Sequence, residues 1–246
     1  MFNFSFDRRA IYILIAIIIL SSIVNYMNNP ESFFWLIVSI PGVLIAITFH
    51  EFAHGYAAYK LGDDTAKQEG RLSLNPFKHL DLVGIVMLLF AGFGWGKPVN
   101  VNPRNYTREI SMEKGEAIVS VAGPLMNIFL AIIFAIIYAL IYKYVDSSFY
   151  ISTMGRILMM LISSIISINI GLGIFNLIPL PPLDGSKIII PFLPYNAKEW
   201  FRSNELIFYY IFVLIWITGL ASYIISPAIN IVTSGVMKLA TMIVGL

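Results

Sequence analysis

Long apolar runs alternate with polar stretches along the chain, and each run has the length at which an α-helix crosses a bilayer. The runs occupy residues 10–27, 33–61, 115–142, 154–178, 205–225 and 227–246. Polar residues such as Asn230 and Lys238 weaken the last run, which could instead lie in the membrane interface. The pattern predicts an all-α polytopic membrane protein, a bundle of about five to six transmembrane helices.

The first run shares one feature with a secretory signal, because Arg8 and Arg9 precede its apolar stretch. It ends, however, in Asn25 and Tyr26, and not in the small residues of a cleavage site. We therefore expect an uncleaved first transmembrane helix at residues 10–27.

A mixed stretch, residues 62–114, separates the second run from the third. Polar and apolar residues alternate at 71–75 and at 99–103, as they do in half-buried strands. Residues 82–93 are apolar but too few to cross a bilayer as a helix, so they could form a re-entrant segment or a strand pair. We expect a small β-containing, membrane-associated insert here.

The composition agrees with a membrane protein and excludes other classes. Only 12% of the residues are charged, whereas soluble domains carry roughly 25%. The net charge of +2 gives no basic face for nucleic acid, so the expected surroundings are the lipid bilayer and no nucleic acid is expected as a partner. The chain has no cysteine, so a bound metal would need His, Asp or Glu ligands.

Three ionisable groups lie inside the second run, where a charge costs roughly 2.5–3.5 kcal/mol. His50 and His54 are four residues apart, so they share one helix face and can reach a single metal ion. Glu51 is adjacent and can act on a water bound to that ion. This is the His-Glu-x-x-His arrangement of zinc hydrolases, and it predicts a Zn²⁺ cofactor.

Two histidines do not complete such a site, because hydrolytic zinc usually has three protein ligands. Asp184 is the favoured third ligand, since the prolines before it unwind the fourth run close to the depth of the histidines. His79 lies in a polar loop, and we expect a loop or substrate-region role for it. Glu116, which another class of membrane zinc protease would use, lies at the interface and so at the wrong depth.

These motifs, HEFAH at 50–54 and NLIPLPPLDG at 176–185, resemble the site-2 protease family of intramembrane zinc metalloproteases. GRLSLNP at 70–76, GWGKPV at 94–99 and AGPLMN at 122–127 are also similar to it. The resemblance implies zinc ligands at His50, His54 and Asp184, a catalytic Glu51, and an Asn176 that holds substrate backbone. Asn127 is a further candidate for substrate binding.

The resemblance also implies how the chain is organised and what it does. It is similar to the compact bacterial or archaeal members without PDZ or CBS domains. We expect a single domain, 1–246, with a core at 33–187, a first helix at 10–27 and C-terminal helices at 205–246. The expected function is zinc-dependent intramembrane endopeptidase activity on the transmembrane segments of protein or peptide substrates.

The alternative to a protease is a zinc-binding membrane scaffold or metal carrier without hydrolytic activity. A carrier usually places polar residues on several helices along a path. Here they cluster at one depth, which favours the protease.

Lys and Arg are unevenly distributed around the predicted helices. They precede the first run, recur through the 62–114 insert and return at 187–202, whereas only Lys143 and Arg156 fall on the opposite side, with Lys238 in the last run. Positively charged loops remain in the cytoplasm. We therefore expect a multi-pass protein of the cytoplasmic membrane, with its amino terminus and active-site opening facing the cytoplasm.

Overall fold

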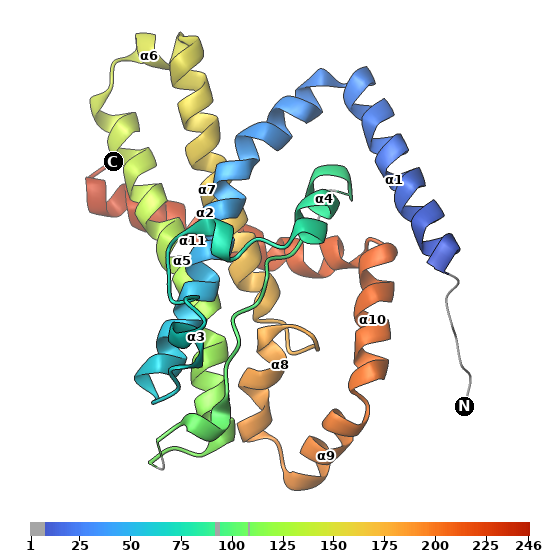
Figure 1. Ribbon diagram of the computed structural model, residues 1–246. Helices are drawn as coiled ribbons and strands as arrows, with labels where there is room; N and C mark the ends of the chain where they lie inside the picture. Colours follow the sequence, from blue (N-terminus) through green and yellow to red (C-terminus); the bar gives the residue numbers. More distant parts are fainter. Residues whose placement is uncertain (1–7, 92–93, 108) are drawn as a thin grey trace.

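The computed structural model describes residues 8–91, 94–107 and 109–246, and helices make up most of them (Figure 1). The long helices are α1 (Arg8–Asn28), α2 (Pro30–Lys60), α5 (Met112–Tyr144), α7 (Thr153–Asn176), α10 (Glu205–Ile217) and α11 (Leu220–Val244). The short helices are α3 (Thr65–Gln68), α4 (Leu82–Ala91), α6 (Ser147–Ile151), α8 (Asp184–Ile189) and α9 (Tyr195–Ser203). Single 3-10 turns lie at Pro76–Lys78, Pro103–Asn105 and Ile190–Phe192.

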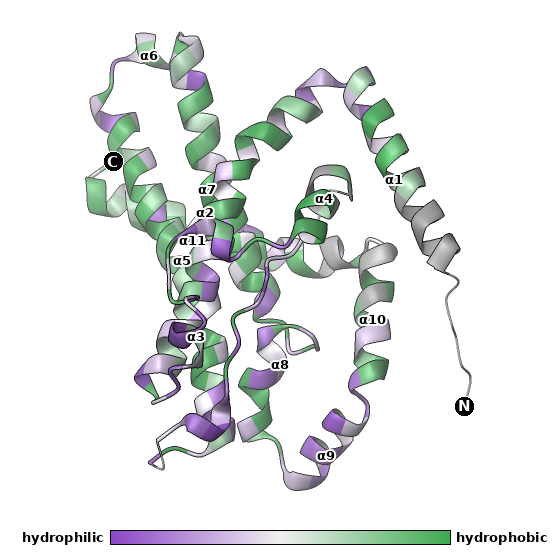
Figure 2. Cartoon of the chain, in the orientation of Figure 1, coloured by the Kyte–Doolittle hydropathy of each residue, from purple (hydrophilic) through white to green (hydrophobic). Residues whose placement is uncertain are grey.

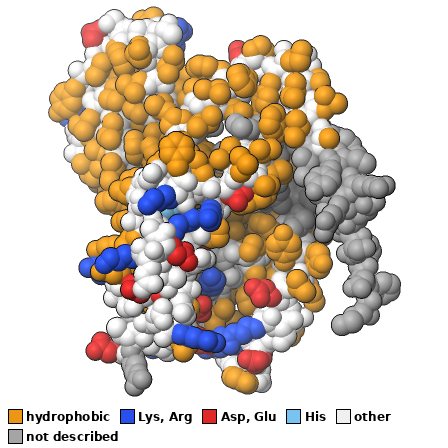
Figure 3. All heavy atoms as spheres, in the orientation of Figure 1, with side chains coloured by type: hydrophobic (Ala, Val, Ile, Leu, Met, Phe, Trp, Pro, Cys, Tyr) orange, Lys and Arg blue, Asp and Glu red, His pale blue; other side chains and the backbone are white. Residues whose placement is uncertain are grey.

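Four segments of the described chain are long and apolar enough to cross a membrane: α2, α5, α7 and the Ile225–Val244 part of α11. The prediction of a helical membrane protein is therefore confirmed. Figure 2 shows apolar residues along these helices, while polar residues gather around α3, α8 and α9. Figure 3 shows the same division on one face, with hydrophobic side chains over the upper half and most charged ones below.

The core forms where α5, α7 and α11 meet. Three small residues of α5, Ala131, Ala135 and Ala139, are fully or almost fully buried and follow one another at turns of the helix. They allow close packing against buried residues of the other two helices, which are Ile162, Ile166, Ile170, Val236, Ala240 and Val244. In Figure 1, α11 crosses the other two helices, so it belongs to the bundle.

The C-terminal helices differ from the prediction in where they break. The expected helix at 205–225 ends at Ile217, because Gly219 takes a left-handed conformation with φ of 72°. Pro227, where the sequence placed the boundary, lies inside α11. Transmembrane helices tolerate proline within them, so a proline alone does not mark a helix end. The thirteen residues of α10 span about 20 Å, less than the hydrocarbon core.

The insert also differs from the prediction, because its described residues contain no strand. They form a single antiparallel bridge between Leu80 and Gly96. Residues 82–91 of the apolar segment form helix α4, and residues 92–93 lie outside the described part. In the second alternating segment, 99–103, the backbone N–H groups of Val99 and Asn102 donate to the side chains of Glu51 and Asp63 instead of to a neighbouring strand.

Asp63, three residues after the end of α2, joins two loops of the insert. Its buried carboxylate accepts hydrogen bonds from the Asn102 backbone N–H at 2.7 Å, the Asn105 amide at 2.8 Å and both donors of Thr65. Burial acts to raise the pKa of Asp63, but these hydrogen bonds favour the ionised form and leave its pKa below the ordinary value. The ionised carboxylate therefore holds two loops of the insert together.

Candidate metal centre

Helix α2 presents two imidazoles to the start of α8. The Nε2 atoms of His50 and His54 lie 3.0 Å apart, as expected for residues one turn apart on a helix. Asp184, the first residue of α8, places Oδ2 3.1 Å from the Nε2 of His50 and 3.2 Å from that of His54. In the described chain these residues form a group that could hold a metal ion, and neither Glu116 nor His79 belongs to it.

Hydrogen bonds on the far side of each ring determine which nitrogen carries the proton. The Nδ1 of His54 lies 2.7 Å from the carbonyl oxygen of Val119, and the Nδ1 of His50 lies 2.6 Å from the Oδ1 of Asn127. Both oxygens can only accept, so both Nδ1 atoms donate. In the neutral rings, each Nε2 then carries a lone pair. Two lone pairs and a carboxylate oxygen thus converge on one point, an arrangement that a cation stabilises.

The orientation of Asn127 is itself determined by a second asparagine. The Nδ2 of Asn169 on α7 donates to the carbonyl oxygen of Ile165 at 2.9 Å, so its Oδ1 faces Asn127 as an acceptor. The Nδ2 of Asn127 donates to that Oδ1 and to the carbonyl oxygen of Ala46, both at 3.0 Å. The Oδ1 of Asn127 is therefore directed at His50, and the chain of bonds joins α7, α5 and α2.

The donor set fits zinc. Ligands at about 2.0–2.2 Å from a tetrahedral ion lie about 3.3–3.5 Å from one another, close to the separations found here. Two neutral imidazoles and one carboxylate are ligands that zinc accepts, and they leave a fourth position for water. The side chain of Asp184 is 19% exposed, against 7% and 11% for His50 and His54, so the site opens on the aspartate side.

Gly123 on α5 makes room for the two rings. A Cβ atom at this position would lie 2.5 Å from the Nε2 of His54 and 2.7 Å from the Cε1 of His50. Any side chain there would displace the imidazoles. The sequence contains Gly123 within a family-like motif, but a requirement for glycine follows only from the packed rings.

Glu51 lies on α2 beside His50 but outside the group of donor atoms. Its half-buried carboxylate accepts a hydrogen bond of 2.8 Å from the backbone N–H of Val99 in the insert. Glu51, the predicted base, is thus held by Val99 of the insert, and this contact was not predicted from the sequence.

The other predicted residues lie around this centre. The Nδ2 of Asn176, at the end of α7, donates to Leu172 of its own helix at 3.0 Å, and the described contacts give its Oδ1 no partner. Asn127 is completely buried, and its amide is fully used by the bonds above. His79 is buried in the insert, where its Nε2 donates to the carbonyl oxygen of Ser73 at 2.7 Å.

Sequence reasoning missed Asn169, which belongs to the hydrogen-bonded network around the candidate site. Its side chain is completely buried in α7 and is linked to His50 through two hydrogen bonds, with Asn127 between them. A signal was present, because an asparagine in an apolar membrane helix is costly unless it has partners.

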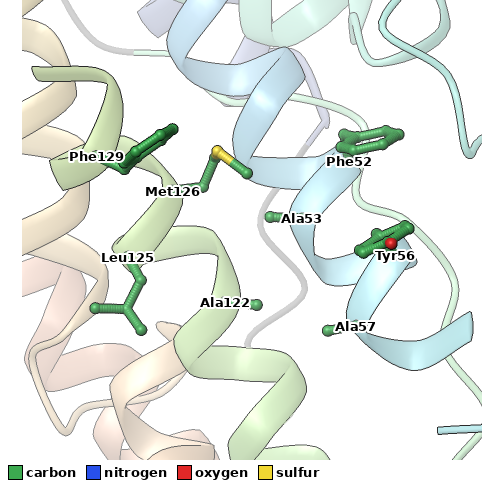
Figure 4. A pocket seen from close by; sticks show the side chains of 8 residues that line it. All are labelled: Phe52, Ala53, Tyr56, Ala57, Ala122, Leu125, Met126 and Phe129. Atoms are coloured by element: carbon green, nitrogen blue, oxygen red, sulfur yellow. The ribbon is translucent and has the colours of Figure 1, made fainter. Parts of the chain in front are cut away.

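An apolar groove of about 310 Å³ lies between α2 and α5 (Figure 4). Its lining consists of apolar and aromatic side chains, which are Phe52, Ala53, Tyr56, Ala57, Ala122, Leu125, Met126 and Phe129. None of the metal-binding candidates is among its lining residues.

Comparisons with known proteins identify a peptidase family and relatives named as zinc metalloproteases. Residues 147–219 match the family described as Peptidase family M50. The chain is 38% identical over 197 residues to the candidate zinc metalloprotease YwhC of Bacillus subtilis (strain 168), covering 80% of this chain and 88% of YwhC. It is 29% identical to the candidate zinc metalloprotease MJ0611 of Methanocaldococcus jannaschii, covering 87% of this chain and 98% of MJ0611.

A third relative, zinc metalloprotease MJ0392 of the same archaeon, is 26% identical, covering 72% of this chain and 39% of MJ0392. No solved structure matches the chain at a significant level. The family match and the extensive similarity to YwhC show that the chain belongs to peptidase family M50, the site-2 protease family of zinc metalloproteases.

Proposed function

We propose that the protein is a zinc-dependent intramembrane endopeptidase that cleaves the transmembrane segments of membrane proteins. The observation that carries the proposal is the convergence of His50, His54 and Asp184 inside an apolar helix bundle, with Glu51 beside them. In a hydrolytic site, a carboxylate next to the metal acts as a general base. In a site that only binds metal, such a carboxylate has no comparable role.

The residues of the centre divide the work of peptide hydrolysis. His50, His54 and Asp184 would hold the zinc ion, which supplies a Lewis acid and lowers the pKa of its bound water to about 7. Glu51 would accept the proton of the attacking water and deliver it to the leaving nitrogen.

The two asparagines take different roles in the proposal. Asn176 would bind the substrate backbone, and because its Nδ2 is used within α7, its Oδ1 is the group that can accept a substrate N–H. Asn127 was a candidate for the same task, but its buried amide is fully used. Its contacts favour a positioning role, in which it holds His50 in the metal-binding tautomer.

The site would open toward the cytoplasm. Most Lys and Arg residues lie at the end of the molecule that carries the insert and α9. Because positively charged loops remain cytoplasmic, this end is the cytoplasmic one. The partial exposure of Asp184 on this side gives water a route to a centre surrounded by lipid.

The test is cleavage of a panel of tagged single-span membrane peptides by the purified protein in detergent. Wild type is compared with Glu51→Gln, which retains the three metal-binding residues. We expect cleavage by wild type, loss of cleavage in Glu51→Gln and equal zinc content in both. Equal cleavage by both proteins would refute the role of Glu51. Bound zinc without cleavage of any peptide would favour a zinc-binding scaffold or carrier.

A further inference from the structure

A strand-like strap, residues 96–99, lies along the face of α2 that carries Glu51. At one end, a Cβ atom on Gly96 would come within 2.5 Å of the Ile47 side chain, so only glycine allows this approach. At the other end, the N–H of Val99 donates to the Oε2 of Glu51 at 2.8 Å. The side chain of Val99 also reaches Gly55, where an added Cβ atom would lie 3.3 Å from it. The strap therefore follows α2 for two turns and contacts the proposed base.

Arg71, from another part of the insert, holds the strap by hydrogen bonds. Its Nη2 donates to the carbonyl oxygen of Lys97 and, at 3.1 Å, to that of Pro98. The Arg71 side chain is buried, yet it takes part in no ion pair within the described chain. A buried charge without a carboxylate partner is costly, and the bonds to two carbonyl oxygens are its compensation.

The peptide group between Pro98 and Val99 connects Arg71 with Glu51. Its C=O accepts from Arg71, and its N–H donates to Glu51. The C=O and N–H of a trans peptide point in opposite directions in one rigid plane, so fixing the oxygen also fixes the direction of the N–H. The cation and the carboxylate polarise the same group, which strengthens both hydrogen bonds.

His79 supports the same arrangement. Its carbonyl oxygen accepts the N–H of Lys97 at 2.8 Å, while its ring donates to Ser73. His79 and Arg71 thus hold the strap at the two peptide groups on either side of Lys97. This leaves Val99 little freedom to turn away from Glu51.

We propose that Arg71 is a positioning residue for Glu51, which it holds in the catalytic orientation through the Pro98–Val99 peptide. The inference rests on the proposed function, because it has Arg71 orient Glu51, the proposed catalytic base. It predicts that loss of the guanidinium lowers kcat and leaves zinc binding and KM almost unchanged. Misplacement of a catalytic group by about 1 Å can cost on the order of 100-fold in rate.

The experiment compares four full-length proteins on the single-span peptide that wild type cleaves fastest. They are wild type, Arg71→Met, Arg71→Lys and the control Arg104→Met, which removes an exposed arginine of the same insert. For each protein we would measure kcat, KM, zinc content and the hydrogen-exchange rate of the Val99 amide. Glu51→Ala, which removes the acceptor of that amide, serves as the reference for fast exchange.

We expect kcat of Arg71→Met to fall on the order of 10- to 100-fold, with KM within about threefold of wild type. Zinc content should stay the same, and the Val99 amide should exchange as fast as in Glu51→Ala. The kcat of Arg71→Lys should lie between those of wild type and Arg71→Met, because lysine keeps the positive charge but lacks the planar guanidinium. Arg104→Met should match wild type.

Three results would overturn the proposal: an unchanged kcat in Arg71→Met, a change confined to KM, or slow Val99 exchange in both arginine variants. If wild type cleaves no peptide, the proposed function fails instead. Exchange of the Val99 amide would still decide whether Arg71 orients the group bound to Glu51. If Arg71→Met does not fold, Arg71→Lys is compared with wild type, and Glu51→Ala remains the reference for fast exchange.

Discussion

Replacing Asn127 by leucine tests the electronic argument for the metal centre. The substitution keeps an uncharged side chain of similar size at a completely buried position, so it leaves no large cavity. It removes the acceptor that holds the proton on the Nδ1 of His50. The ring can then rotate or exchange its tautomer, and the lone pair on Nε2 is no longer held toward His54 and Asp184.

The magnitude follows from the bonds that Asn127 makes. Loss of a residue that orients a metal ligand typically costs 10- to 100-fold in metal affinity, or about 1.4–2.7 kcal/mol. Its bonds to His50, Ala46 and Asn169 join three helices, and each such bond in a membrane bundle contributes about 0.6 kcal/mol. Their loss amounts to about 2 kcal/mol, which a typical fold stability of 5–15 kcal/mol can absorb.

The assay is a competition titration of zinc against a chelator, with thermal unfolding measured on the same samples. Asn176→Leu is the matched control, because the described contacts of Asn176 reach only its own helix. We expect weaker zinc binding in Asn127→Leu and unchanged binding in the control. An Asn127→Leu protein that folds and binds zinc with wild-type affinity would refute the reasoning about the His50 tautomer.

Further predictions concern the third ligand, the packing of the rings and the insert. Asp184→Ala should lose most of its bound zinc in metal analysis, whereas Glu116→Ala should retain it; the reverse would reassign the ligand. Gly123→Val should lose zinc and activity, because its Cβ would lie 2.5 Å from the Nε2 of His54, and an active variant would contradict this packing. Asp63→Asn should be less stable than wild type, because the lowered pKa of Asp63 makes the carboxylate stabilising above its ordinary value of 3.8. In thermal unfolding this difference should be constant above about pH 5 and shrink as the pH falls below about 4; a difference that does not change with pH would contradict it.

The main helices and the group of side chains that the structure brings together could be predicted from the sequence, because each depends on local spacing. The apolar runs require helices in a bilayer. His50 and His54 share a face by helix geometry alone, and the proline-rich break before Asp184 indicated its depth. Each of these inferences uses the residue spacing within one segment, or compares the depths of two segments in the membrane.

The remaining features depend on contacts between distant segments. Pro227 signals a break in sequence, yet it lies inside α11, and Gly219 provides the turn instead. The alternating pattern at 99–103 predicted a strand. Its backbone instead bonds to Glu51 and Asp63, which no local pattern reveals. Asn169 has a role only because Asn127 lies opposite it.

The central claim is that His50, Glu51, His54 and Asp184 form a peptidase centre that acts within the bilayer. The most direct measurement is mass-spectrometric mapping of the products from a single-span peptide in liposomes, for wild type and Glu51→Gln with equal zinc content. The account predicts cleavage inside the membrane-spanning segment by wild type and none by the variant. Cleavage only outside the membrane-spanning segment, or identical products from both proteins, would contradict it.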